Sequence, residues 1–296
     1  VSGTRIVSEQ FAGPNRGKAV GLYVTGFYLA TSLSLIFSGA LLGQFSWRFS
    51  YWILATASAI GPILAYTLLK KMNTQDSRTS RSTPGLKLAV LRNRAARLMM
   101  LGYSLHAWEL YLMRMWFAPF LVAVLISNGY NQEVASTLGS TTAGFIMAIG
   151  AIGPFLGGML SDRIGRTGAA SLIFSISGLC SFGLGWMLEA PWLMVLGVGL
   201  VYSFFVGFDS SVYTTAVTEL ADPRSLGSSL ALHSFLGFGA GMISPIVFGI
   251  IQDATGPAHG WGWGFATGGV AAVGAVAAML VLRSMPESKS MANGKR

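Results

Sequence analysis

Three ionisable side chains stand inside one apolar stretch of this sequence. The stretch Leu98–Ile126 contains His106, Glu109 and Arg114. On a helix, their spacing places all three on one broad polar flank. Charged groups in apolar surroundings are costly and serve a proton, an ion or a charged ligand. We therefore interpret Glu109 as a candidate proton site and Arg114 as a candidate site for a negatively charged solute. In the alternative interpretation, the two side chains neutralise each other or a neighbouring helix.

Two further ionisable residues lie in other apolar stretches. Asp209 is followed by Ser210, Ser211 and Tyr213, whose hydroxyls can support either an ionised or a reversibly protonated carboxyl. It can equally be a structural carboxylate bonded to serines or to loop arginines. His233 is a candidate coupling residue or, alternatively, a hydrogen-bonded packing residue.

The sequence has no motif for metal binding, nucleophilic catalysis or phosphate binding. The three histidines stand on separate segments without metal-ligand spacing, and Cys180 lies alone in an apolar segment. Neither a nucleophile constellation nor a phosphate-binding loop is present. We therefore expect no enzyme, no metal site and no cofactor.

The composition places these residues in a membrane. Hydrophobic residues make up 52%, charged residues only 10%, and the mean hydropathy is +0.58, whereas a soluble domain has about 25% charged residues. The net charge of +9 would suit nucleic acid, but no basic patch with interleaved aromatic residues occurs outside the loops. We expect the protein to lie in a lipid bilayer and to have no nucleic-acid partner.

Eight segments are long enough to cross an apolar layer of about 30 Å as helices. They predict an all-α, polytopic integral membrane helix bundle, and they run over Ala19–Leu42, Tyr51–Leu69, Leu98–Ile126, Ala135–Leu160, Ala169–Leu188, Trp192–Val217, Ser228–Ile251 and Trp261–Leu282. With this assignment, 18 of the 20 Lys and Arg residues fall on one side of the layer. Because basic residues collect on the cytoplasmic side, we expect both ends and the polar stretch 70–97 in the cytoplasm.

A charged turn connects the fourth and fifth segments. It reads GMLSDRIGRT over residues 158–167. Gly165 permits a tight turn, and the charges of Asp162, Arg163 and Arg166 can pair with helix ends. The turn resembles the inter-helix signature of the major facilitator superfamily, G-x-x-x-D-[RK]-x-G-R-[RK], and departs from it only at Thr167. The alternative is an ordinary cytoplasmic loop of another polytopic protein.

An internal repeat supports the resemblance. Residues 7–16 are echoed by residues 217–224, each immediately before an apolar segment, and the first two segments match the last two. The resemblance implies two six-helix halves. We therefore expect helices five to twelve of an N-terminally truncated chain: the end of the first half in residues 1–69, a linker in 70–97, the second half in 98–284 and a tail in 285–296.

The resemblance also implies a function and a gate. We expect a secondary transporter that works by alternating access, couples to protons and carries a small solute, with an anion favoured by Arg114. The alternative is a non-transporting receptor or assembly subunit. Asp162 should cap the helix that begins near Ala19, and Arg163 or Arg166 should meet Glu219 or Asp222. With Gly158 and Gly165, these groups would form the cytoplasmic gate. We expect a monomer when full-length, in the inner (plasma) membrane of a bacterium.

Overall fold

The computed structural model describes residues 2–11, 15–42, 47–69, 88–221 and 225–285. Within these ranges the fold is all-α, as predicted. The helices are α1 (Ser2–Gln10), α2 (Arg16–Leu42), α3 (Trp47–Leu69), the 3-10 helix η2 (Leu88–Arg92), α4 (Arg94–Ser127), α5 (Gln132–Gly150), α6 (Gly153–Ile164), α7 (Arg166–Leu184), α8 (Trp192–Leu220) and α9 (Leu226–Arg283).

The predicted crossing segments correspond to helices in the described part of the chain, most of them with bounds shifted by a few residues. Three of the differences have a clear local cause. The segment Ala135–Leu160 is divided between α5 and α6, and Pro154, which has no backbone N–H to donate, stands in the first turn of α6. The last two segments form arms of α9, which bends where Gly256 takes φ 74° and ψ 171°. The third begins at Arg94 rather than Leu98, because the Asn93 side chain accepts hydrogen bonds from the amides of Ala95 and Ala96 at 2.9 and 3.2 Å.

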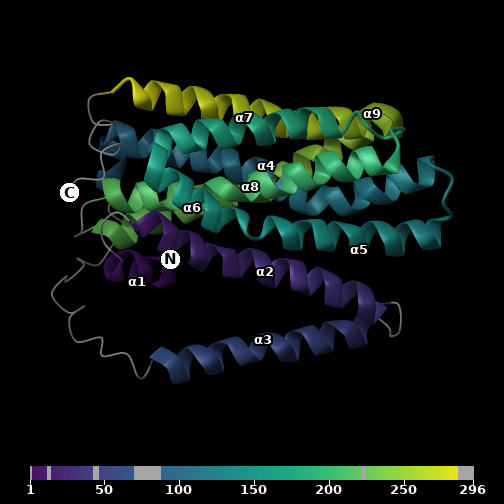
Figure 1. Cartoon of the computed structure of the whole chain (residues 1–296), viewed down its shortest axis with the longest axis horizontal. Coiled ribbons are helices and arrows are strands. Elements are labelled where there is room, and N and C mark those ends of the chain that lie inside the picture. Colours follow the sequence, from purple (N-terminus) through teal and green to yellow (C-terminus); the bar gives the residue numbers. More distant parts are fainter. Residues whose placement is uncertain (1, 12–14, 43–46, 70–87, 222–224, 286–296) are drawn as a thin grey trace.

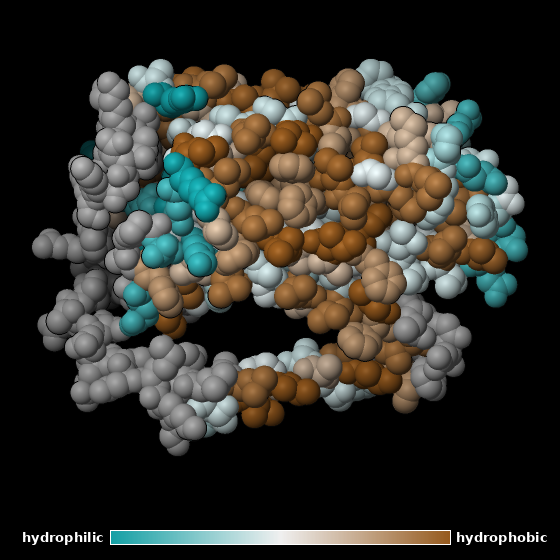
Figure 2. Space-filling model, in the orientation of Figure 1, coloured by the Kyte–Doolittle hydropathy of each residue, from teal (hydrophilic) through white to brown (hydrophobic). Residues whose placement is uncertain are grey.

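Five of the described helical stretches are long and apolar enough to cross a membrane. They are Arg94–Ser127, Gln132–Ile164, Arg166–Leu184, Trp192–Leu220 and Leu226–Arg283, and a shorter apolar stretch covers Tyr51–Leu64. Figure 2 shows apolar residues along the middle of the molecule and hydrophilic residues toward its two ends. This distribution matches an apolar layer between two aqueous surfaces.

The helix pair α2 and α3 meets the rest of the bundle through α2 alone. Helix α2 packs on α5, α6 and α8, whereas α3 stands apart from them (Figure 1). Apolar side chains on α3 are therefore open to the surroundings, and Trp52 and Tyr66 are 72% and 67% exposed. The contacts between the two expected halves are consequently made mainly by α2, with a smaller contribution from the packing of α1 on α9.

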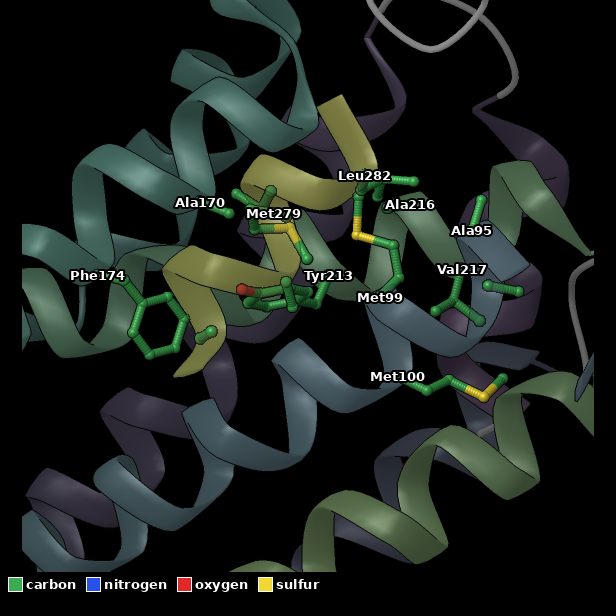
Figure 3. Close-up of a cluster of buried hydrophobic side chains, with 14 of the residues drawn as sticks. Ala95, Met99, Met100, Ala170, Phe174, Tyr213, Ala216, Val217, Met279 and Leu282 are labelled. Carbon is green, nitrogen blue, oxygen red and sulfur yellow. The ribbon is translucent and has the colours of Figure 1, made fainter. Parts of the chain in front are cut away.

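Two hydrophobic clusters follow the length of α4. The first surrounds Met99 and Met100 and includes Phe174 of α7, Tyr213 of α8 and Met279 of α9 (Figure 3). The second extends from Leu110 to Val124 and takes in aromatic rings of α8 and α9. His106 and Glu109 lie on α4 between the two clusters, so their buried polar atoms depend on partners from neighbouring helices.

Candidate functional site

A buried polar network joins α2, α4 and α8. Nδ1 of His106 lies 2.8 Å from Oδ1 of Asp209, and Nε2 of the same ring lies 2.7 Å from Oγ of Ser210. The Ser210 hydroxyl is also 2.7 Å from the hydroxyl of Tyr28. All four side chains are buried. An imidazole between a carboxylate and a hydroxyl can take up or release a proton without moving.

This arrangement shows which group Asp209 meets. The carboxylate contacts the His106 imidazole. Ser210 contacts His106 and Tyr28, while Ser211 donates to the Pro154 carbonyl oxygen at 2.7 Å. The expected bonds of Asp209 to serines or to loop arginines are not found among the described residues, and its functional role stays a prediction.

A cavity of about 490 Å³ borders the network. Its walls come from α1, α2, α4, α8 and α9, and they are mostly aromatic and apolar, with a few hydroxyls and two imidazoles. The lining residues that matter most are Tyr28, Tyr103, His106, Tyr111, Ser210 and His233. Concave sites of this size with a few convergent polar groups suit small organic ligands.

His233 presents an unpartnered imidazole to this cavity. Its ring stacks on that of Tyr103, with centroids 3.7 Å apart and planes at 23°. The residue is 3% exposed, and neither ring nitrogen has a hydrogen-bond partner. The alternative of a hydrogen-bonded packing residue is therefore wrong for the described part of the chain. A buried donor or acceptor without a partner costs about 1–3 kcal/mol, which a ligand hydroxyl or carboxyl would offset.

Arg114 lies among aromatic rings rather than beside an acid. Its guanidinium carbon is 4.4 Å from the ring centroid of Tyr28, 4.9 Å from that of Phe27 and 5.7 Å from that of Tyr111. Its Nη2 is buried without a hydrogen-bond partner, and it forms no ion pair with any described residue. Cation–π contacts therefore hold a positive charge that no carboxylate neutralises within the described ranges.

Glu109 faces a different set of helices. Its Oε2 accepts a hydrogen bond from Ser177 of α7 at 3.2 Å, and its side chain is fully buried. Glu109 and Arg114 therefore do not neutralise each other in the described structure, whereas the other half of that interpretation, a partner from a neighbouring helix, describes the bond from Ser177. The five residues from Glu109 to Arg114 rotate the helix by one full turn and about 140° more. The two side chains therefore lie at different edges of the predicted polar flank and meet different neighbouring helices.

The charged turn forms the contacts predicted for it. Oδ2 of Asp162 accepts the Lys18 amide at the start of α2 at 3.0 Å. Nη2 and Nε of Arg166 donate to the two carboxylate oxygens of Glu219 at 2.7 and 3.2 Å, and Nη1 donates to Oδ1 of Asp162 at 2.5 Å and to Oγ of Ser161 at 2.6 Å. Arg163 is exposed, and Asp222 lies outside the described residues.

Glycines allow the turn and the close approach of α2. Gly165 has φ 82°, a left-handed conformation that favours glycine. A Cβ added to Gly17 would lie 2.5 Å from Oδ1 of Asp162 and 2.7 Å from Nη1 of Arg166. A Cβ at Gly158 would collide with the Gly17 carbonyl oxygen. The two backbones therefore touch where the ion pairs form, and this explains why the sequence carries glycine on both sides.

One member of the polar network was not foreseen from the sequence. Tyr28 stands in an apolar segment rich in aromatic residues, where no local pattern separates a hydrogen-bonding tyrosine from a packing one. Its role follows only from the approach of α2 to α8. Among the described residues, no group of three or more His, Cys, Asp or Glu side chains is placed to hold a metal ion.

The comparisons with known proteins agree with the helix arrangement. The family model of the Major Facilitator Superfamily matches residues 1–245 and 110–296. A hexuronate transporter of Bacillus subtilis is 23% identical, covering 86% of this chain and 63% of the relative. An uncharacterized MFS-type transporter of the same organism is 25% identical over 93% of this chain and 66% of its own length. A probable 4-methylmuconolactone transporter of Cupriavidus pinatubonensis is 24% identical over 80% of this chain and 57% of its own length.

Two conclusions follow from these matches. The chain spans 63% and 66% of the lengths of the two Bacillus relatives. The family match extends over the whole sequence and includes the apolar helices and the charged turn. This protein is an integral membrane protein that belongs to the major facilitator superfamily.

Proposed function

We propose that this chain is part of a secondary transporter that moves a small solute by alternating access, coupled to protons. The observation that carries the proposal is the buried contact of His106 and Asp209 with Ser210 and Tyr28 beside the central cavity. Tyr28 comes from α2, whereas the other three come from α4 and α8. A movement of α2 away from these helices would break the Tyr28 contact and change the solvation of His106.

The pair of His106 and Asp209 supplies a simple basis for coupling. With a neutral imidazole the pair carries one negative charge, and a proton taken up by His106 makes it neutral overall. A change of conformation that opens the cavity to water would change the solvation of this pair. The proposal is that a proton is exchanged at the pair during that change. Asp209 would act by holding the His106 ring in one orientation.

The proposed solute is an organic anion. Arg114 supplies an unneutralised positive charge beside the cavity wall, held by Phe27, Tyr28 and Tyr111. Tyr28 and Tyr111 also line the cavity, so a ligand carboxylate could reach the guanidinium by displacing one ring. His233 offers a hydrogen bond at another part of the wall. That one relative is named a hexuronate transporter supports an acid of this kind.

The turn that contains Asp162 and Arg166 is the proposed cytoplasmic gate. Asp162 accepts the Lys18 amide and so joins the first turn of α2 to α6, while Arg166 of α7 joins Asp162 to Glu219 at the end of α8. These contacts would hold the two halves together on one side of the membrane while the other side is open. The proposal includes an inner bacterial membrane, cytoplasmic placement of residues 70–97 and of the C-terminus, and a monomer formed by the full-length chain.

The test is solute flux in proteoliposomes that contain the full-length protein. A pH gradient should drive accumulation of an acid from a panel that includes hexuronates. His106→Gln should abolish this accumulation and leave solute exchange in place, because exchange requires binding and movement but no net proton transfer. The matched control is His259→Gln at an exposed histidine, which should behave as the parent. Absence of flux across the panel would favour the alternative function of a receptor or assembly subunit.

A further inference from the structure

A second buried polar cluster lies away from the central cavity, inside the C-terminal helices. Glu109 of α4 has 0% exposure, and its Oε1 has no hydrogen-bond partner. Its Oε2 accepts a single bond from Ser177 at 3.2 Å. A carboxyl group buried in this way leaves part of its hydrogen-bonding capacity unused, which is costly in an apolar interior. A ligand that met Oε1 would remove this cost.

The oxygens around Glu109 come from three other helices. Ser177 and Ser181 belong to α7, Tyr202 to α8 and Phe265 to α9. The Tyr202 hydroxyl adjoins the carboxylate and donates to Oγ of Ser181 at 3.0 Å. Ser181 in turn donates to the backbone carbonyl of Phe265 at 2.9 Å. These contacts link a carboxylate, three hydroxyls and a carbonyl, and oxygen-only sets of this kind bind hard cations.

The backbone opposite Glu109 makes this convergence possible. Gly268 of α9 faces the cluster, and a Cβ added there would collide with Oγ of Ser181 and lie 3.4 Å from Cγ of Glu109. Any larger residue would therefore displace the hydroxyl from the carboxylate. The polar cluster, and not helix packing alone, therefore explains why position 268 is a glycine.

The charges around Glu109 favour a monovalent cation as its ligand. The charged group among the described residues that acts on Glu109 is another acid, Asp209, so no arginine or lysine there neutralises it. A monovalent cation would make the site neutral, whereas a divalent ion would leave a positive charge in the membrane. A soft metal would need more than the single thiol of Cys180 nearby.

We propose that Glu109, Ser177, Ser181 and Tyr202 form a binding site for a sodium ion, separate from the central cavity. The hydroxyls already lie within hydrogen-bond distance of one another or of the carboxylate, and such closely spaced oxygens suit sodium better than the larger potassium ion. The ion would take the place of the missing partner of Oε1 and link α4, α7 and α8. This inference does not depend on proton coupling at His106.

The experiment measures thermal unfolding of the purified full-length protein at pH 8.5, in choline chloride to which NaCl or KCl is added at constant ionic strength. Sodium should raise the melting temperature in a saturable way, because a ligand that binds only the folded state stabilises it. Potassium should have a much smaller effect. Glu109→Gln should abolish the sodium effect, and Ser177→Ala should weaken the apparent affinity about tenfold, consistent with loss of one ligand worth about 1.4 kcal/mol.

Two controls keep the result interpretable. Glu133→Gln removes an exposed acid at the other end of the bundle and should keep the full sodium response. Ser177→Ala retains the carboxylate, so it reports on the site if Glu109→Gln does not fold. The proposal is overturned if the parent protein shows no sodium-specific rise, or if the rise persists unchanged in both site variants. Because the readout is stability, failure of transport in the flux assay would leave this test unaffected.

Discussion

Replacing Asp162 by alanine should open the proposed cytoplasmic gate. Oδ2 of Asp162 accepts the Lys18 amide of α2 at 3.0 Å, and this bond joins the two expected halves. Arg166 donates to Oδ1 of the same carboxylate and is itself held by Glu219. The Asp162 side chain is 15% exposed, so solvent weakens its bonds only in part. Hydrogen bonds to charged groups contribute about 1.5–3 kcal/mol, so we expect a loss of about 2 kcal/mol.

This loss should appear as a change in the populations of two conformations. At 1.4 kcal/mol per factor of ten, 2 kcal/mol favours the open form about 30-fold. Spin labels at Leu22 on α2 and Ile164 on α6, both exposed and next to the gate, would report the change as a longer inter-label distance. The background should carry Cys180→Ser, since Cys180 is the chain's single cysteine.

A matched variant separates the gate from a general effect of charge. Glu133→Gln removes an exposed acid at the start of α5 and should leave the distance distribution as in the parent. Glu219→Gln should shift it in the same direction but less, because it loosens Arg166, which orients Asp162, and leaves the bond from the Lys18 amide in place. An unchanged distribution in both gate variants would mean that these contacts do not hold the closed state.

Three further outcomes follow from single contacts. Tyr28→Phe removes the hydroxyl that meets Ser210 but keeps the ring beside Arg114; it should favour the open form about 5-fold, for a loss of about 1 kcal/mol, in the same spin-label assay. Arg114→Gln should weaken binding of an anionic solute at least tenfold in an isothermal titration, whereas Arg114→Lys should lose less, and equal affinity in all three proteins would exclude Arg114 as the anion site. Asn93→Ala should lower the free energy of unfolding by about 1 kcal/mol, measured by denaturant titration, because it removes the cap of α4.

The sequence predicted the helices and the gate better than the central site. Apolar segments of membrane length are a local signal, and so is the turn around Gly165, because its partners are helix ends fixed by the same pattern. The pairing of Arg166 with Glu219 could therefore be anticipated. The breaks near Pro154 and at Gly256 could not be placed, since both occur within continuous apolar sequence.

The partners of the buried ionisable groups depend on rotation of α4 and on the approach of other helices. His106 and Glu109 are three residues apart, yet one contacts α8 and the other α7. Arg114, which could have been paired with Glu109, instead contacts rings of α2 and α4. Periodicity identifies a broad flank but not which neighbour each position meets. The charge balance of the cavity is consequently a tertiary property.

Helix α2 carries both of the contacts that matter for the proposed movement. Its first turn contacts Asp162, and Tyr28 contacts Ser210. Ten residues separate Lys18 from Tyr28, which is about 15 Å along a helix. If α2 moves as one rigid body, both contacts are present in the closed state and absent in the open state. Their contributions to the equilibrium should then add, since residues so far apart without shared partners are usually independent to within about 0.5 kcal/mol.

The double variant Asp162→Ala/Tyr28→Phe tests whether α2 behaves in this way. Additivity predicts a loss of about 3 kcal/mol in total, so the open form should be favoured about 150-fold. The spin-label distances of the parent, the two single variants and the double variant complete the cycle. A coupling energy well above 0.5 kcal/mol would show that α2 bends between the gate and the cavity, and that the two contacts open in separate steps.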